Sequence, residues 1–284
     1  MSMKKALVLS GGGAKGAFQA GVIYNLSKKT SWNSIFGVSA GAINGAALAM
    51  YNQDNVGFAA NKLLNHWKED IRDNKVYKKW VFINSLNYII AFWKNGLYNT
   101  KPLKVFLEKN LSAESIKGSD VDYFLGVTSF TKGSYKLVDK HTENLIEWIL
   151  ASASFPMAFP PIKIQDEYFV DGAVRNCVPI KDALSTGAKH IDIIINDPFG
   201  GHVKTNKRPD NVLDMFVRTA EILSDEVFIA DLRACCEQFD ATIAIYSPEQ
   251  YLTDNPLDFS SDAINKMINK GLEIKEPFFI QKTR

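Results

Sequence analysis

Cysteine is scarce in this sequence, which disfavours a secreted, disulfide-rich protein. The chain has three cysteines in 284 residues. Two of them, Cys235 and Cys236, are consecutive, and consecutive cysteines rarely bridge each other. This odd number and spacing fit a reducing compartment better than a disulfide framework. We therefore expect a cytoplasmic protein.

Long apolar runs are absent as well. No segment is long and apolar enough to span a bilayer. The short apolar run 6–9 follows two lysines, as in a signal peptide, but it passes directly into glycines. It is too short for the apolar part of such a peptide. Any contact with a membrane is therefore expected to be peripheral.

Acidic residues are missing from the start of the chain. The first 53 residues contain five lysines and neither Asp nor Glu. The first 118 residues carry a net charge of +10, whereas the remaining 166 carry −8. A basic front half could face an anionic surface or substrate, although an ordinary solvated face is slightly favoured. No nucleic-acid-binding motif accompanies the basic residues, so nucleic acid is not an expected partner.

Linkers, internal repeats and low-complexity stretches are also missing, so the sequence predicts a single domain over residues 1–284. Residues 54–118 form an insertion in that domain and are predicted to contain two or three helices. Interleaved aromatic side chains and lysines suit a cap that meets a lipid–water interface, but they equally suit helices packed on the core. The aromatic residues are Trp67, Tyr77, Trp80, Phe82, Tyr88, Phe92, Trp93 and Tyr98, and the lysines are Lys75, Lys78, Lys79 and Lys94.

Strand-like and helical segments alternate along the rest of the chain, which predicts a layered α/β fold. Strands are expected at 5–9, 123–130, 134–138, 189–195 and 241–246, and helices at 17–26, 40–50, 100–109 and 144–152. A later, long helix is expected to bury one apolar face. That face comprises Leu213, Phe216, Val217, Ala220, Leu223 and Val227.

A glycine-rich turn at residues 10–16, Ser-Gly-Gly-Gly-Ala-Lys-Gly, joins a predicted strand to a predicted helix. Such a turn exposes backbone amides that bind anions. A dinucleotide site needs an acidic residue about 20 positions later, and none occurs before Asp54. A phosphate-binding loop needs Ser or Thr after Lys15, where Gly16 stands. The remaining interpretation is an oxyanion hole. Its candidate donors are the amides of Gly11, Gly12, Gly13 and Ala14.

A second turn carries the candidate nucleophile. Residues 37–41 are Gly-Val-Ser-Ala-Gly, preceded by a β-prone run and followed by a helix of small residues. This is the context of a nucleophile elbow at Ser39. Gly37 and Gly41 supply the clearance that the tight turn requires. Two consecutive strand–helix units would place both turns at the same edge of a parallel sheet, so the glycine amides would face an acyl group attacked by Ser39.

The base that activates Ser39 is open from the residues alone. None of the four histidines lies in a turn typical of a catalytic triad, although the order Ser39, Asp171, His202 occurs in hydrolases. Asp171 ends a predicted strand at a glycine turn, so its carboxylate would project beyond the sheet edge. Burial would raise the pKa of Asp171 and let it accept the proton directly. The four histidines are His66, His141, His190 and His202.

Four motifs together resemble the patatin-like phospholipase family. They are Ser-Gly-Gly-Gly-Ala-Lys-Gly at 10–16, Gly-Val-Ser-Ala-Gly at 37–41, Ala-Ser-Ala-Ser-Phe-Pro-x-x-Phe-Pro-Pro at 151–161 and Asp-Gly-Ala at 171–173. They occur in the family's order within residues 5–196. The resemblance implies a three-layer α/β/α sandwich with a mostly parallel central sheet. It also implies a dyad of Ser39 and Asp171 without histidine, metal or other cofactor. Supporting positions are Lys15, Gly16, Gly37, Gly41 and Gly172.

The activity implied by the resemblance is hydrolysis of phospholipid or lysophospholipid esters. The acyl group would pass through an ester with Ser39, and Asp171 would be the base. Two alternatives remain: an acyltransferase that uses the same acyl-enzyme, and a non-catalytic lipid-binding or regulatory module. The expected partner is therefore a lipid ester, with contact to a membrane surface as a further expectation.

Overall fold

The computed structural model describes residues 4–73, 75–76, 78–79, 96, 98–199, 212–253 and 255–281. Within these residues the main sheet contains β1 (Lys5–Leu9), β2 (Ser34–Val38), β5 (Asp122–Ser129), β6 (Ser134–Asp139), β7 (Ile162–Ile164), β8 (Glu167–Asp171), β9 (His190–Ile194), β10 (Thr242–Tyr246) and β11 (Phe279–Gln281). The strand order is β11-β10-β9-β1-β2-β5-β8-β7, and β6 pairs with β5 beside this path. A separate ribbon consists of β3 (Lys78–Lys79) and β4 (Tyr98–Asn99).

The centre of the main sheet is parallel. Strands β10, β9, β1, β2 and β5 run in one direction, and the outer strands pair antiparallel. Strand β1 is apolar at successive positions because both faces of such a sheet are covered. Ala6 and Val8 belong to the core on one face, and Leu7 and Leu9 to the core on the other. All four side chains are fully buried.

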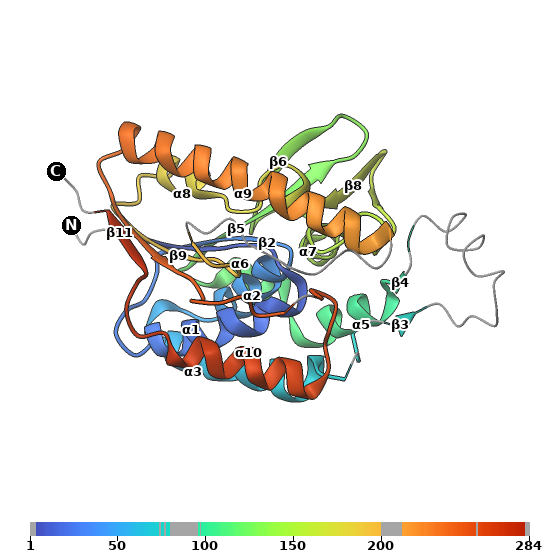
Figure 1. Cartoon of the computed structure of the whole chain (residues 1–284), viewed down its shortest axis with the longest axis horizontal. Helices are drawn as coiled ribbons and strands as arrows, with labels where there is room; N and C mark the ends of the chain where they lie inside the picture. The colour runs from blue at the N-terminus through green and yellow to red at the C-terminus, as the bar shows by residue number, and fades with distance from the viewer. Residues whose placement is uncertain are drawn as a thin grey trace.

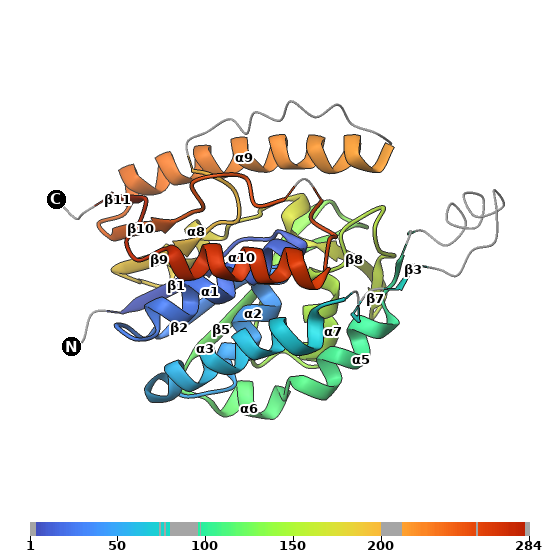
Figure 2. The same ribbon diagram turned by 60° about the horizontal axis from the view of Figure 1, so that its bottom comes forward.

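Helices cover both faces of this sheet (Figure 1). One face carries α8 (Ile180–Ser185) and α9 (Val212–Gln238). The opposite face carries α1 (Gly16–Leu26), α2 (Ala40–Ala49), α3 (Val56–Asn65) and α10 (Ser261–Glu273). Figure 2 shows the same two layers from another side, with α5 (Lys101–Asn110), α6 (Ala113–Gly118) and α7 (Leu145–Ser152) in the second layer. The three-layer α/β/α sandwich with a mostly parallel sheet is thus confirmed.

The described part of residues 54–118 contributes helices to the core. Helix α3 buries Ala59, Ala60, Leu63 and Leu64. A π-helical turn, His66–Ile71, follows it. Trp67 in this turn is buried, and its indole N–H donates to Asn44 Oδ1 at 2.9 Å. Most of the other aromatic residues and lysines of the predicted cap, from Tyr77 through Lys94, have side chains outside the described residues, so the cap stays a prediction.

The predicted inward face of α9 is wrong in part. Leu223 is 63% exposed and Val227 is 41% exposed. The side chains buried against the sheet are those of Phe228, Leu232 and Cys235. The error has a physical cause: the inward face also carries polar residues that line a pocket, so hydrophobic periodicity misplaces it. Leu213 and Val217 have side chains outside the described part of the chain.

The remaining predicted elements agree with the structure to within a few residues. The strand expected at 189–195 is β9 and the helix expected at 144–152 is α7. In the described part of the chain, no helix combines the length and hydropathy that a membrane crossing requires.

Candidate active site

Ser39 and Asp171 come together because two strands end against the same edge of β5. Strand β2 pairs with the first part of β5, as far as Val38 opposite Gly126. Strand β8 runs the other way and pairs with the last part of β5, so that Asp171 lies opposite Val127. Strand β6 occupies the other edge of β5 at both places. The carboxyl ends of β2 and β8 therefore face each other, and Ser39 follows directly after the end of β2.

The backbone of Ser39 is held in an unusual conformation. Its φ is 57° and its ψ is −125°, a region that residues with a side chain seldom adopt and that costs about 1–3 kcal/mol. A side chain on Gly37 would collide with the carbonyl of Gly41, and one on Gly41 would collide with the carbonyl of Leu9. The turn can therefore form only with glycine at both positions. Its geometry turns Ser39 from the strand into the N-terminus of α2.

The Asp171 carboxyl group is buried, and no positively charged side chain of the described residues pairs with it. Its exposed fraction is 1%. Oδ1 accepts a hydrogen bond from the Ala173 amide at 2.9 Å. Oδ2 has no hydrogen bond of ordinary geometry to the described residues, although the Ser39 side chain is near enough to act on the titration of this carboxyl group. Burial raises the pKa of Asp171 to about 7, and the Ala173 amide and Ser39 offset that rise only in part.

The glycine turn lies beside Ser39, and two of its four candidate amides are already engaged. A Cβ on Gly11 would lie 3.3 Å from the Ser39 Cβ. The Gly11 amide donates to the Cys177 carbonyl at 3.2 Å, and the Ala14 amide donates to the Pro256 carbonyl at 2.8 Å. The amides of Gly12 and Gly13 donate to no group among the described residues. Their φ values of 156° and 57° require glycine, so this shape of the turn depends on both positions.

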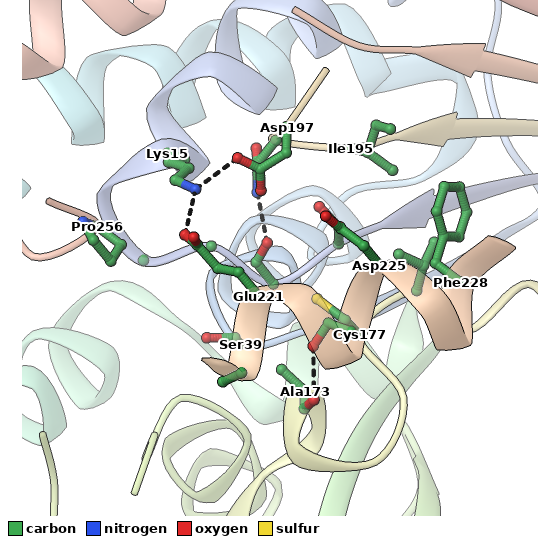
Figure 3. A pocket seen from close by; sticks show the side chains of 18 of the residues that line it. Lys15, Ser39, Ala173, Cys177, Ile195, Asp197, Glu221, Asp225, Phe228 and Pro256 are labelled. Carbon is green, nitrogen blue, oxygen red and sulfur yellow. Dashed lines mark hydrogen bonds and ion pairs between the residues drawn. The ribbon is translucent and has the colours of Figure 1, made fainter. Parts of the chain in front are cut away.

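Lys15, which is itself buried, anchors the turn through a cluster of ion pairs with two partly exposed carboxylates (Figure 3). Its ammonium group lies 2.7 Å from Asp197 Oδ1 and 3.2 Å from Glu221 Oε1. Burial alone would lower the pKa of Lys15, but the two carboxylates outweigh burial and raise it above its ordinary value. Tyr251 donates its hydroxyl to the other oxygen of Glu221 at 2.8 Å. This cluster ties the glycine turn to the end of β9 and to α9.

Gly16 and Gly172 allow close approaches at the edges of the site. A side chain on Gly16 would collide with the Trp67 ring and the Ala40 Cβ. One on Gly172 would collide with the carbonyl of Gly126. Both glycines therefore let the turns that carry the candidate residues press against neighbouring elements.

These groups line a cavity of about 500 Å³. Ser39, Asp171 and the glycine turn contribute to its wall, together with the Lys15 cluster. Apolar side chains complete the wall; they include Phe155, Phe159, Phe199, Phe228, Ile229 and Leu257. The cavity therefore combines a small polar centre with an apolar remainder. In the described ranges, no group of three or more His, Cys, Asp or Glu side chains is arranged to hold a metal ion.

No histidine lines the described part of this cavity. His66 Nδ1 lies 2.7 Å from Asp70, and His190 Nε2 lies 3.1 Å from Asp192. His141 is exposed on the surface. His202, the histidine with the chain order of a triad, lies outside the described residues.

Several polar residues of the site were not predicted from the sequence, among them the partners of Lys15 and two residues that bind the backbone of the turns. Ser152 accepts a hydrogen bond from the Ser39 amide, and Asn196 donates from Nδ2 to the Gly11 carbonyl at 2.8 Å. Ser152 lies within the motif at 151–161, so that motif contained a signal. Asn196 follows a buried parallel strand, and side chains just beyond such strands often line sites.

Sequence comparisons relate this chain to known proteins. A profile of the patatin-like phospholipase family matches residues 7–184. The lysophospholipase NTE1 of Meyerozyma guilliermondii is 27% identical over 190 residues, which cover 65% of this chain and 12% of that protein. The triacylglycerol lipase 4 of Saccharomyces cerevisiae is 27% identical over 203 residues, which cover 62% of this chain and 22% of that protein.

Among solved structures, VipD from Legionella pneumophila aligns with a TM-score of 0.48 and 13% identity, over 96% of this chain and 66% of that one. The chain spans only a small part of the length of the two curated relatives named above. The family profile covers more than half of the chain, and the chain belongs to the patatin-like phospholipase family.

Proposed function

We propose that this protein hydrolyses lipid esters, with Ser39 as nucleophile and Asp171 as general base. The observation that supports this most directly is the meeting of the two residues at one point of β5. A serine is a weak nucleophile until a base takes its proton. A buried carboxyl group with a pKa of about 7 can take that proton near neutral pH.

In the proposed reaction Ser39 Oγ attacks the ester carbonyl carbon while Asp171 accepts the hydroxyl proton. The negative charge that develops on the carbonyl oxygen would be bound by the unengaged amides of Gly12 and Gly13. The alcohol then leaves with the proton from Asp171, and the acyl group remains on Ser39. Water, deprotonated by Asp171, attacks this ester; the bond to Ser39 Oγ breaks, Asp171 returns the proton to Oγ, and the fatty acid is released.

The proposed substrates are phospholipids or lysophospholipids. The apolar wall of the cavity suits an acyl chain, and its polar centre suits the ester group. Relatives named as a lysophospholipase and as a triacylglycerol lipase share the lipid ester bond as the bond that is cleaved. Contact with a membrane surface and a cytoplasmic location stay predictions.

The test combines labelling with lipid hydrolysis. An alkyl fluorophosphonate should add its mass to Ser39, as located by peptide mass spectrometry, and should abolish release of fatty acid from lysophosphatidylcholine vesicles. His202→Ala should retain activity, since the proposed base is Asp171. Lack of labelling in folded protein would contradict the proposal. An acyltransferase would instead pass the acyl group to an added lysolipid acceptor, which product analysis detects.

A further inference from the structure

The amide of Ser39 has no partner in the strand ladder. The ladder along this edge of β5 changes from β2 to β8 between Gly126 and Val127. The β5 position that would continue the pairing of β2 beyond Val38 is occupied by Asp171. A buried backbone amide without a partner is costly, so another group must accept its hydrogen.

The hydroxyl group of Ser152 is that acceptor. The Ser39 amide donates to Ser152 Oγ at 2.9 Å, and Ser152 Oγ donates to the Gly126 carbonyl at 2.7 Å. Ser152 is fully buried at the end of α7. One hydroxyl thus joins the nucleophile's backbone to the β5 residue that lies opposite its neighbour Val38.

The same helix end also holds the backbone of Asp171. The Asp171 amide donates to the Ser154 carbonyl at 3.0 Å. The two partners of the candidate dyad are therefore attached to the last residue of α7, Ser152, and to Ser154, two residues beyond it. The attachment to Asp171 uses the main chain, but the attachment to Ser39 depends on a side chain and can be removed by substitution.

We propose that Ser152 is a positioning residue for the reaction: its hydroxyl holds the Ser39 backbone in the conformation that directs Oγ towards Asp171. This rests on the proposed role of Ser39 as nucleophile. Without the hydroxyl, the unusual φ and ψ of Ser39 lose their hydrogen-bonded support, and the turn relaxes. The pocket wall does not change, because Ser152 does not line the cavity.

The experiment compares Ser152→Ala with the wild type in three measurements. They are steady-state hydrolysis of p-nitrophenyl butyrate, the rate of fluorophosphonate labelling of Ser39, and Tm. We expect kcat to fall about 10- to 100-fold, with KM changed by less than about twofold. The labelling rate should fall by a similar factor, since labelling reports the same attack by Ser39.

A matched control removes a similar hydroxyl at a distance. Ser119 is buried and accepts a hydrogen bond from the Val121 amide at 3.0 Å, near the opposite end of β5. Ser119→Ala, which removes one buried hydrogen bond where Ser152→Ala removes two, should lower Tm but leave kcat and labelling unchanged. Equal losses of kcat in the two variants would overturn the proposal, as would a Ser152→Ala enzyme with the wild-type labelling rate.

A second variant covers the case in which Ser152→Ala does not fold. Ser152→Cys fills the same space with a group that hydrogen-bonds weakly, so it should fold and be slowed in the same way. Full activity of Ser152→Cys would contradict the proposed role. If the wild type itself is not labelled, the proposed function fails. If the wild type is labelled and the Ser152 variants are labelled at the same rate, only the proposed role of Ser152 fails.

Discussion

Asp171 and Asp197 line the same cavity, yet their surroundings differ. Asp171 is 1% exposed and has no positively charged neighbour among the described residues. Asp197 is 27% exposed and lies 2.7 Å from the Lys15 ammonium group. The first carboxyl group is destabilised as an anion by its burial. The second forms an ion pair that also fastens the glycine turn to the end of β9.

The comparison shows how one pocket can use the same residue type in two ways. A base must give up and take up a proton near neutral pH, so it cannot have a permanent cation beside it. An anchor must stay charged and paired, so it needs the cation. Distance from Lys15 therefore distinguishes the candidate base from the structural carboxylate.

The largest expected effect is on turnover. Asp171→Asn should lower kcat/KM for lysophosphatidylcholine by at least about 10³-fold, because the nucleophile loses its base. Asp197→Asn should lower it by about tenfold or less, since Asp197 acts only through the position of the glycine turn. Release of fatty acid by the two purified variants measures this directly. Similar losses in both would remove the distinction between base and anchor.

The second effect is the dependence of activity on pH. Because the base must be ionised and the pKa of Asp171 is raised to about 7, kcat/KM should fall about tenfold per pH unit below 7 and level off above it. Asp225 in the same cavity also has a raised pKa, of about 6, caused by burial and then by Asp197 and Glu221. Asp225→Asn should leave the inflection of the pH profile in place. If the inflection moves in this variant, it reports the titration of Asp225 and not that of Asp171.

The third effect is on stability, through the Lys15 cluster. Lys15→Met leaves Asp197 and Glu221 without their shared cation, and should lower the free energy of unfolding by about 2 kcal/mol. Removing the lysine would lower the stability more if both carboxylates were fully buried, but they are partly exposed. Urea denaturation measures the change. Lys270→Met, which removes an exposed ion pair with Glu273 at 2.9 Å, should change the stability much less, because solvent screens that pair.

The smallest effect concerns the stability of the Asp171→Asn variant. A carboxyl group whose pKa is higher in the folded state than in the unfolded state contributes stability below its unfolded pKa, and that contribution is lost as pH rises through the folded value. For Asp171 this loss runs from about pH 4 to about pH 7. The stability of Asp171→Asn relative to the wild type should therefore be greater at pH 8 than at pH 4. Thermal unfolding at the two pH values tests this, and a difference that does not vary with pH would contradict it.

The local elements of the site followed well from the sequence, since they depend on neighbouring residues. Apolar runs and glycines predict the strand 5–9 and the turns at 10–16 and 37–41. The partners of Lys15 could not be predicted in this way, because Asp197 and Glu221 are 182 and 206 positions away in the chain. The inward face of α9 was misplaced for a related reason: a pocket wall carries polar groups where a close-packed core would carry apolar ones.

The meeting of Ser39 and Asp171 depends on pairing that spacing along the chain does not reveal. Motif spacing placed both residues at strand ends, but only the antiparallel course of β8 brings Asp171 towards β2. The resemblance to a family supplied the pairing of the two residues without its physical cause. That cause is the change of partner strand along β5.

Strand β5 thereby determines the relative positions of Ser39 and Asp171. Gly126 and Val127 are consecutive, and each sets the longitudinal position of one of the two strand ends. Deleting or inserting a single residue there would shift one strand end relative to the other by about 3.3 Å and turn alternate side chains to the opposite face. The length of an inert strand is thus as critical to the chemistry as the identity of either reacting group.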